Sequence, residues 1–131
     1  MISCIISLRD THLLVKVSQS IDETIGVPYE VIAISNADGS LGICAAYNLG
    51  VSRSRFDLLV FLHEDVIIKI SGWGNNLLRY FNERKDIGWV GVAGGLYKTK
   101  APSLWSSFAP GYPQLELYYL VQHYKDRPRN L

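Results

Sequence analysis

Three consecutive residues of types that often do chemistry, His63, Glu64 and Asp65, stand at the end of an apolar run. On an extended chain successive side chains alternate, so His63 and Asp65 should face one side and Glu64 the other. An aspartate oxygen suits Mg²⁺ or Mn²⁺, and such ions take one or two protein carboxylates together with phosphate oxygens. The pair therefore indicates a metal-assisted phosphate site. Taken alone, the triplet is explained somewhat better by a surface turn whose carboxylates cap helices.

Strand-like and helix-like segments alternate around this triplet. Short apolar runs bounded by turn residues predict strands near residues 2–7, 29–35, 57–63 and 88–93. Apolar residues at helical spacing and small-residue runs predict helices over residues 11–25, 41–54 and 72–84. Such alternation implies a mainly parallel sheet flanked by helices, an α/β fold. The third strand is the most hydrophobic, so we expect it at the centre of the sheet.

The ends of the predicted strands carry the polar residues that could form a site. Ligands of open parallel sheets bind beyond the carboxyl ends of the strands. Ser7 and Arg9 stand at the first end, and Ser35 and Asn36 stand at the second. We therefore expect Ser7, Ser35, His63 and Asp65 to converge on one cleft.

The composition excludes several classes of protein. The chain has 131 residues, 48% of them hydrophobic, which suits one globular domain over residues 1–131. Its net charge of +1 gives nucleic-acid binding no electrostatic support. There is no 18-residue apolar stretch and no signal peptide, so we expect no transmembrane segment and a cytoplasmic protein. Cys4 and Cys44 form no zinc motif, and we expect two buried, reduced thiols.

Two neighbouring segments together resemble a known family. Residues 42–50 read G-x-x-x-A-x-N-x-G, and residues 56–65 form an apolar run that ends in His-Glu-Asp. This unit resembles the family 2 glycosyltransferases of GT-A fold, in which the same helix precedes an apolar strand ending in Asp-x-Asp. Residues 87–95 are similar to the family's next strand and its glycine turn. The resemblance covers residues 2–97, and residues 98–131 form a divergent C-terminal segment.

The resemblance implies a Rossmann-like nucleotide-diphospho-sugar transferase fold and a donor site. Asp65 matches the family's metal-binding aspartate, which implies Mn²⁺ or Mg²⁺ as cofactor. His63 stands where the family's first aspartate contacts the ribose or base, and Glu64 fills the variable middle position and should face away. The donor-binding residues implied in this way, together with those at the strand ends, are Ser7, Arg9, Ser35, Asn36, Asn48 and His63. Asn48 is also suited to bracing its own helix or the loop after the third strand.

The implied function is metal-assisted transfer of a sugar, with inversion, from a nucleotide-diphosphate donor to an unknown glycan or lipid-linked acceptor. No acidic residue after Asp65 matches the family's catalytic base, so we expect a chain truncated after the donor-binding half that binds the nucleotide but transfers sugar poorly. Two alternatives stay open. One is a non-catalytic nucleotide-diphosphate-binding fragment. The other is a structural domain that forms homo-oligomers through a sheet edge or through Tyr118 and Tyr119.

Overall fold

The computed structural model describes residues 1–91, 93–95, 116–118, 121–124 and 127–130. These residues belong to two compact units, Met1–Lys85 and Asp86–Leu131. The expectation of a single domain over the whole chain stays a prediction. In the described part of the chain, no helix is long and apolar enough to cross a membrane.

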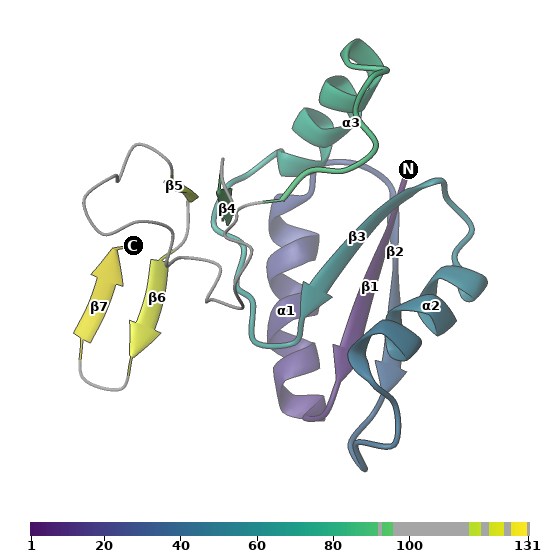
Figure 1. Ribbon diagram of the computed structural model, residues 1–131, viewed down its shortest axis with the longest axis vertical. Helices are drawn as coiled ribbons and strands as arrows, with labels where there is room; N and C mark the ends of the chain where they lie inside the picture. Colours follow the sequence, from purple (N-terminus) through teal and green to yellow (C-terminus); the bar gives the residue numbers. More distant parts are fainter. Residues whose placement is uncertain (92, 96–115, 119–120, 125–126, 131) are drawn as a thin grey trace. The chain divides into compact units, whose positions relative to one another are not determined.

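The first unit is a three-stranded parallel sheet with helices between its strands (Figure 1). Its elements, in chain order, are β1 (Ile2–Leu8), α1 (Thr11–Thr24), β2 (Tyr29–Ser35), α2 (Ile43–Arg53), β3 (Leu58–His63) and α3 (Trp73–Glu83). Six elements therefore lie within a few residues of their predicted bounds. The α/β class and the parallel sheet are confirmed.

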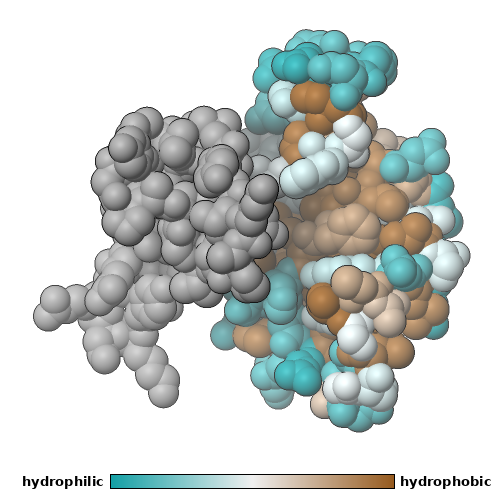
Figure 2. Space-filling model, in the orientation of Figure 1, coloured by the Kyte–Doolittle hydropathy of each residue, from teal (hydrophilic) through white to brown (hydrophobic). Residues whose placement is uncertain are grey.

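The order of the strands is β2-β1-β3, which corrects the prediction that the third strand is central. Every residue of β1 is buried, whereas β3 is partly exposed and its Phe61 side chain is 47% exposed. Figure 2 shows apolar side chains gathered over β3 on this face of the molecule. Hydrophobicity misled the prediction because β3 keeps its apolar residues although it is only partly buried, whereas the less apolar β1 is the fully buried strand.

The helix α1 covers one face of the sheet. The buried core on this face joins Ile2, Cys4 and Ile6 of β1 to three residues of α1 and the turn that follows it: Val17, Ile21 and Ile25. Partly buried leucines and valines of β2 and β3 pack against the same cluster. Asp10 caps the helix, because its carboxylate accepts a hydrogen bond from the His12 backbone N–H at 2.8 Å.

The helix α2 covers the other face, and its small residues let it approach closely. Ala46 is fully buried, and a Cβ added at Gly50 would lie 2.2 Å from Cγ2 of Ile5 in β1. Tyr47 packs edge-on against Phe61 of β3, with 5.1 Å between the ring centroids. Cys44 is exposed on the outer side of the helix, so the expectation of two buried thiols holds only for Cys4.

The second unit differs from the prediction of a strand at 88–93. The strand β4 covers Ala93–Gly95 and pairs antiparallel with β5 (Glu116–Tyr118), whereas residues 88–91 form no strand. Glycine occupies positions 88 and 91, and glycine weakens a strand.

Further along this unit, β6 (Val121–Tyr124) pairs antiparallel with β7 (Arg127–Asn130). Residues 98–115 of the divergent C-terminal segment and Tyr119 lie outside the described residues.

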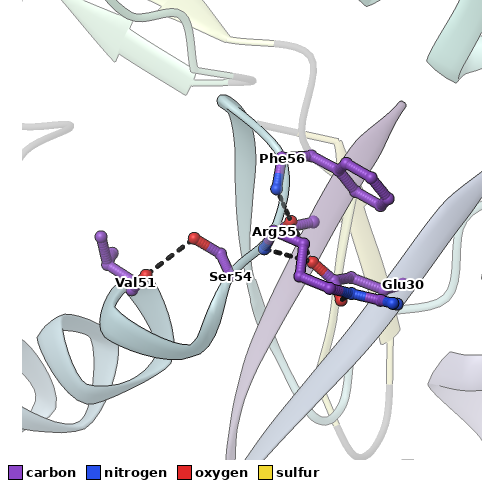
Figure 3. A network of polar contacts seen from close by, with 6 residues as sticks. Glu30, Val51, Ser54, Arg55 and Phe56 are labelled. Carbon is purple, nitrogen blue, oxygen red and sulfur yellow. Dashed lines mark hydrogen bonds and ion pairs between the residues drawn. The ribbon is translucent and has the colours of Figure 1, made fainter.

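A polar network joins the amino ends of the three strands (Figure 3). The Glu30 carboxylate accepts hydrogen bonds from the Ser3 hydroxyl, the Arg55 backbone N–H and the Arg55 Nε, each at 2.7 Å. The Ser3 oxygen in turn accepts a hydrogen bond from the Phe56 backbone N–H at 3.2 Å. The hydrogen bond from Ser3, followed by those from Arg55, lowers the pKa of Glu30 to about 2. This network fixes the start of β3 against β1 and β2.

We expect the substitution Glu30→Gln to remove part of the acid sensitivity of folding. Because the pKa of Glu30 is lower in the folded chain than its usual 4.5, its ionised form stabilises the fold above that value, and this contribution is lost as the pH falls toward 2. Urea unfolding at pH 7 should therefore show the variant to be less stable than the parent, and at pH 2.5 the difference should shrink. Glu83→Gln, at an exposed position on α3, is the matched control. An undiminished difference at pH 2.5 would contradict the prediction.

Candidate functional site

The carboxyl ends of the three strands lie together at the lower edge of the sheet in Figure 1, where Figure 2 shows hydrophilic side chains. Ser7 of β1 is in register with Ile34 of β2 and with His63 of β3, and Leu8 is in register with Ser35. Since neighbouring strands are spaced by about 4.8 Å, the ends of β2 and β3 stand roughly 10 Å apart, with the end of β1 between them. A ligand that bridges the outer strands must cross the loop after β1.

His63 and Asp65 come together in a tight turn at the end of β3. The Val66 backbone N–H donates to the His63 carbonyl at 3.3 Å, which closes a turn with Glu64 and Asp65 at its centre. Nδ1 of His63 lies 3.9 Å from Oδ1 of Asp65, and the two side chains are 68% and 72% exposed. The pairing expected from strand alternation is present, although a turn produces it and the strand itself ends at His63. Both side chains are open to a ligand.

Glu64 points to the loop that follows β1. Its Oε2 accepts hydrogen bonds from the backbone N–H groups of Arg9, at 2.5 Å, and Asp10, at 3.0 Å. These two residues directly precede α1, so Glu64 caps the start of that helix, as the alternative interpretation of the triplet proposed for its carboxylates. Sequence reasoning placed Glu64 away from the site and missed this bridge. Alternation along β3 could have indicated it, because it sends Glu64 to the face that α1 covers.

Arg9 lies against the loop that follows β2. Gly39 in that loop has φ +68°, and a Cβ added there would lie 3.0 Å from Nη2 of Arg9. Two hydrogen bonds with Leu41 hold the Asn36 side chain: its amide donates to the Leu41 carbonyl at 2.8 Å, and its oxygen accepts from the Leu41 N–H at 2.9 Å. The Asp38 carboxylate accepts from the backbone N–H and the hydroxyl of Ser40, which holds the pKa of Asp38 below its usual value. The loop is therefore shaped by its own side chains, and an exposed guanidinium lies beside it.

The remaining predicted donor residues are distributed around this edge. Ser7 is buried on the α2 face, in register with His63. Ser35 is exposed and shares the register of Leu8, so it belongs to the opposite face of the sheet from Ser7. Asn48 is exposed on α2, and its side chain makes no hydrogen bond within the part of the chain that the structure describes. The structure thus brings Arg9, His63 and Asp65 to the ends of β1 and β3. Ser35 and Asn36 stand at the end of β2, and Asn48 stands on α2.

The donor set at the β3 turn suits a metal ion that brings most of its own ligands. Among the described residues, no group of three His, Cys, Asp or Glu side chains could hold a metal. Asp65 offers a carboxylate and His63 an imidazole at 3.9 Å. Mg²⁺ and Mn²⁺ sites of phosphate-binding proteins need only one or two such groups, because phosphate and water oxygens complete the shell. The two residues therefore fit a cation that arrives with a phosphate ligand, and they do not form a protein-only metal site.

Comparisons with curated proteins and with solved structures give no significant match. A protein-family sequence model described as a glycosyltransferase-like family matches residues 1–118. The match covers most of the 131 residues, including the helix-plus-strand unit at residues 42–65 on which the sequence resemblance rests. The three-stranded parallel sheet with flanking helices agrees with it. The chain therefore belongs to the glycosyltransferase-like family.

Proposed function

We propose that the carboxyl edge of the sheet binds the diphosphate of a nucleotide-sugar donor, and that the protein takes part in transfer of the sugar to a glycan or lipid-linked acceptor. One observation carries the proposal: the His63–Asp65 pair stands exposed at the end of β3, beside the loop that contains Arg9, in a chain of this family. An anionic diphosphate matches both an exposed guanidinium and a carboxylate that can share a cation with it.

Each residue has a distinct part in this proposal. Asp65 and His63 hold Mn²⁺ or Mg²⁺, and the cation, when bound, neutralises negative charge on the diphosphate. Arg9 contributes a permanent positive charge at the end of β1. Ser35 and Asn48 supply exposed polar groups for the nucleoside or sugar, while the buried Ser7 lies beside His63 on the neighbouring strand. Asn36 acts through the shape of its loop, because both ends of its amide are bonded to Leu41.

Nucleotide binding without transfer is the second candidate function. Inverting transfer needs a base within hydrogen-bond reach of the acceptor hydroxyl. Several carboxylates that the structure describes near this edge already have partners: Asp10 caps α1, Glu64 binds the loop after β1, and Asp38 binds Ser40. Asp65 is assigned to the cation. This arrangement favours a diphosphate-binding role for the first unit by itself.

Calorimetric titration of the full chain with UDP and with GDP tests the proposal. We expect saturable binding of at least one nucleotide in the presence of Mn²⁺, and we expect EDTA to abolish it. Absence of binding to both nucleotides with Mn²⁺ and with Mg²⁺ would contradict the proposal. Release of free sugar, or its transfer to an added acceptor, from a bound nucleotide sugar would favour the enzyme over the binding module.

A further inference from the structure

Among the three residues His63, Glu64 and Asp65, Glu64 is the one whose side chain hydrogen-bonds another element of the described fold, while Val66 at the end of the turn packs against the core. His63 and Asp65 are mostly exposed and contact each other at 3.9 Å. Glu64, between them, accepts two backbone hydrogen bonds from Arg9 and Asp10, which are 55 and 54 residues distant in sequence. Hydrogen bonds to an ionised acceptor are stronger than those between neutral groups. The position of the turn relative to the start of α1 therefore depends on this carboxylate.

The same two bonds connect both charged parts of the candidate site. Arg9 is one of the two donors, and its guanidinium lies beside Gly39 in the loop after β2. Asp65 is the next residue after Glu64 in the turn. Consequently one carboxylate links the ends of β3 and β1 and, through Arg9, reaches the loop at the end of β2.

We propose that Glu64 is the positioning residue of this site, which holds His63 and Asp65 at a fixed place relative to Arg9. The inference rests on the proposed function for its effect on ligand affinity, but the placement of the turn can be measured without any ligand. A residue that only capped α1 would stabilise the helix and leave the turn unchanged. A positioning residue must affect the turn as well.

Amide hydrogen exchange, measured by NMR on the full chain, separates these two roles. In Glu64→Ala we expect exchange to become about tenfold faster at Arg9 and Asp10, which lose a charged acceptor, and also at Val66, whose N–H closes the turn. Glu64→Gln keeps an acceptor oxygen of the same reach, so it should restore slow exchange at all three amides. Glu83→Ala, at an exposed glutamate of α3, is the control. Faster exchange at Arg9 and Asp10 with an unchanged rate at Val66 would overturn the proposal.

The affinity for UDP with Mn²⁺ provides the second readout. We expect Glu64→Ala to weaken binding about tenfold, and Glu64→Gln and Glu83→Ala to bind within about threefold of the parent. Equal binding by Glu64→Ala and the parent would overturn the positioning role while leaving the proposed function intact. A parent chain that binds no nucleotide would contradict the proposed function, and the exchange rate at Val66 would then decide the role of Glu64.

Discussion

The substitution Ile6→Ala should destabilise the fold by about 2–5 kcal/mol, the range for large-to-small changes in a well-packed core. Ile6 is fully buried in β1, where it packs with Cys4, Val17 and Ile21. A cavity at this position is surrounded on both sides by neighbouring strands and cannot collapse easily. Urea unfolding at pH 7 measures the loss, provided that the denaturant slope stays constant.

The matched variant is Leu62→Ala, because Leu62 is the register partner of Ile6 on β3 and faces the same core. Leu62 is only partly buried on an outer strand, so its truncation should cost less, roughly 1–2 kcal/mol. A central β3 would reverse this ranking. A greater loss of stability in Leu62→Ala than in Ile6→Ala would contradict the strand order β2-β1-β3.

Much of the first unit could be predicted from the sequence because its local signals agree with its fold. Apolar runs marked the strands, and apolar residues at helical spacing marked α1. Strand order could not be predicted in the same way, since it depends on which faces are covered. Ser3 shows the difficulty: a fully buried serine in a central strand is tolerated because Glu30 and Phe56 satisfy its hydroxyl, and these partners are distant in sequence.

The location of the candidate residues at the strand ends could be predicted from the sequence, but the contacts and faces of their side chains could not. The expectation that Ser7, Ser35 and His63 stand at the carboxyl ends of their strands is confirmed, whereas their part in ligand binding stays a prediction. The role of Glu64 was missed because it requires knowing that the end of β3 meets the start of α1. The expected convergence of Ser35 with Ser7 also depended on register, and the two residues lie on opposite faces of the sheet. A shift of one residue in register moves a side chain to the other side of the sheet.

The substitution Asp65→Ala should weaken metal-dependent nucleotide binding by at least about 100-fold. Replacing a residue that merely supports a metal ligand commonly costs about 10- to 100-fold in affinity, and loss of the ligand itself should cost more. Asp65 is the carboxylate that the proposal assigns to the cation, and His63 alone offers a single nitrogen. The side chain is mostly exposed and makes no hydrogen bond with the residues that the structure describes, so its removal should leave stability within about 0.5 kcal/mol of the parent.

Asp57→Ala is the matched control for this experiment. Asp57 is an exposed aspartate that precedes β3, so it stands at the other end of the same strand, about 20 Å from the turn. Both substitutions remove one negative charge, so the two variants have the same net charge, but only Asp65 is close enough to the turn to act on a ligand there. A specific effect of the turn appears as the difference between the two variants.

The most direct test of the account is the binding of UDP or GDP, with Mn²⁺ and with EDTA, to the parent chain, Asp65→Ala and Asp57→Ala by calorimetry. We expect Mn²⁺-dependent binding to the parent and to Asp57→Ala, and binding to Asp65→Ala that is lost or at least about 100-fold weaker. Binding to Asp65→Ala as tight as to the parent, with the same dependence on Mn²⁺, would contradict the assignment of the β3 turn as the metal and diphosphate site.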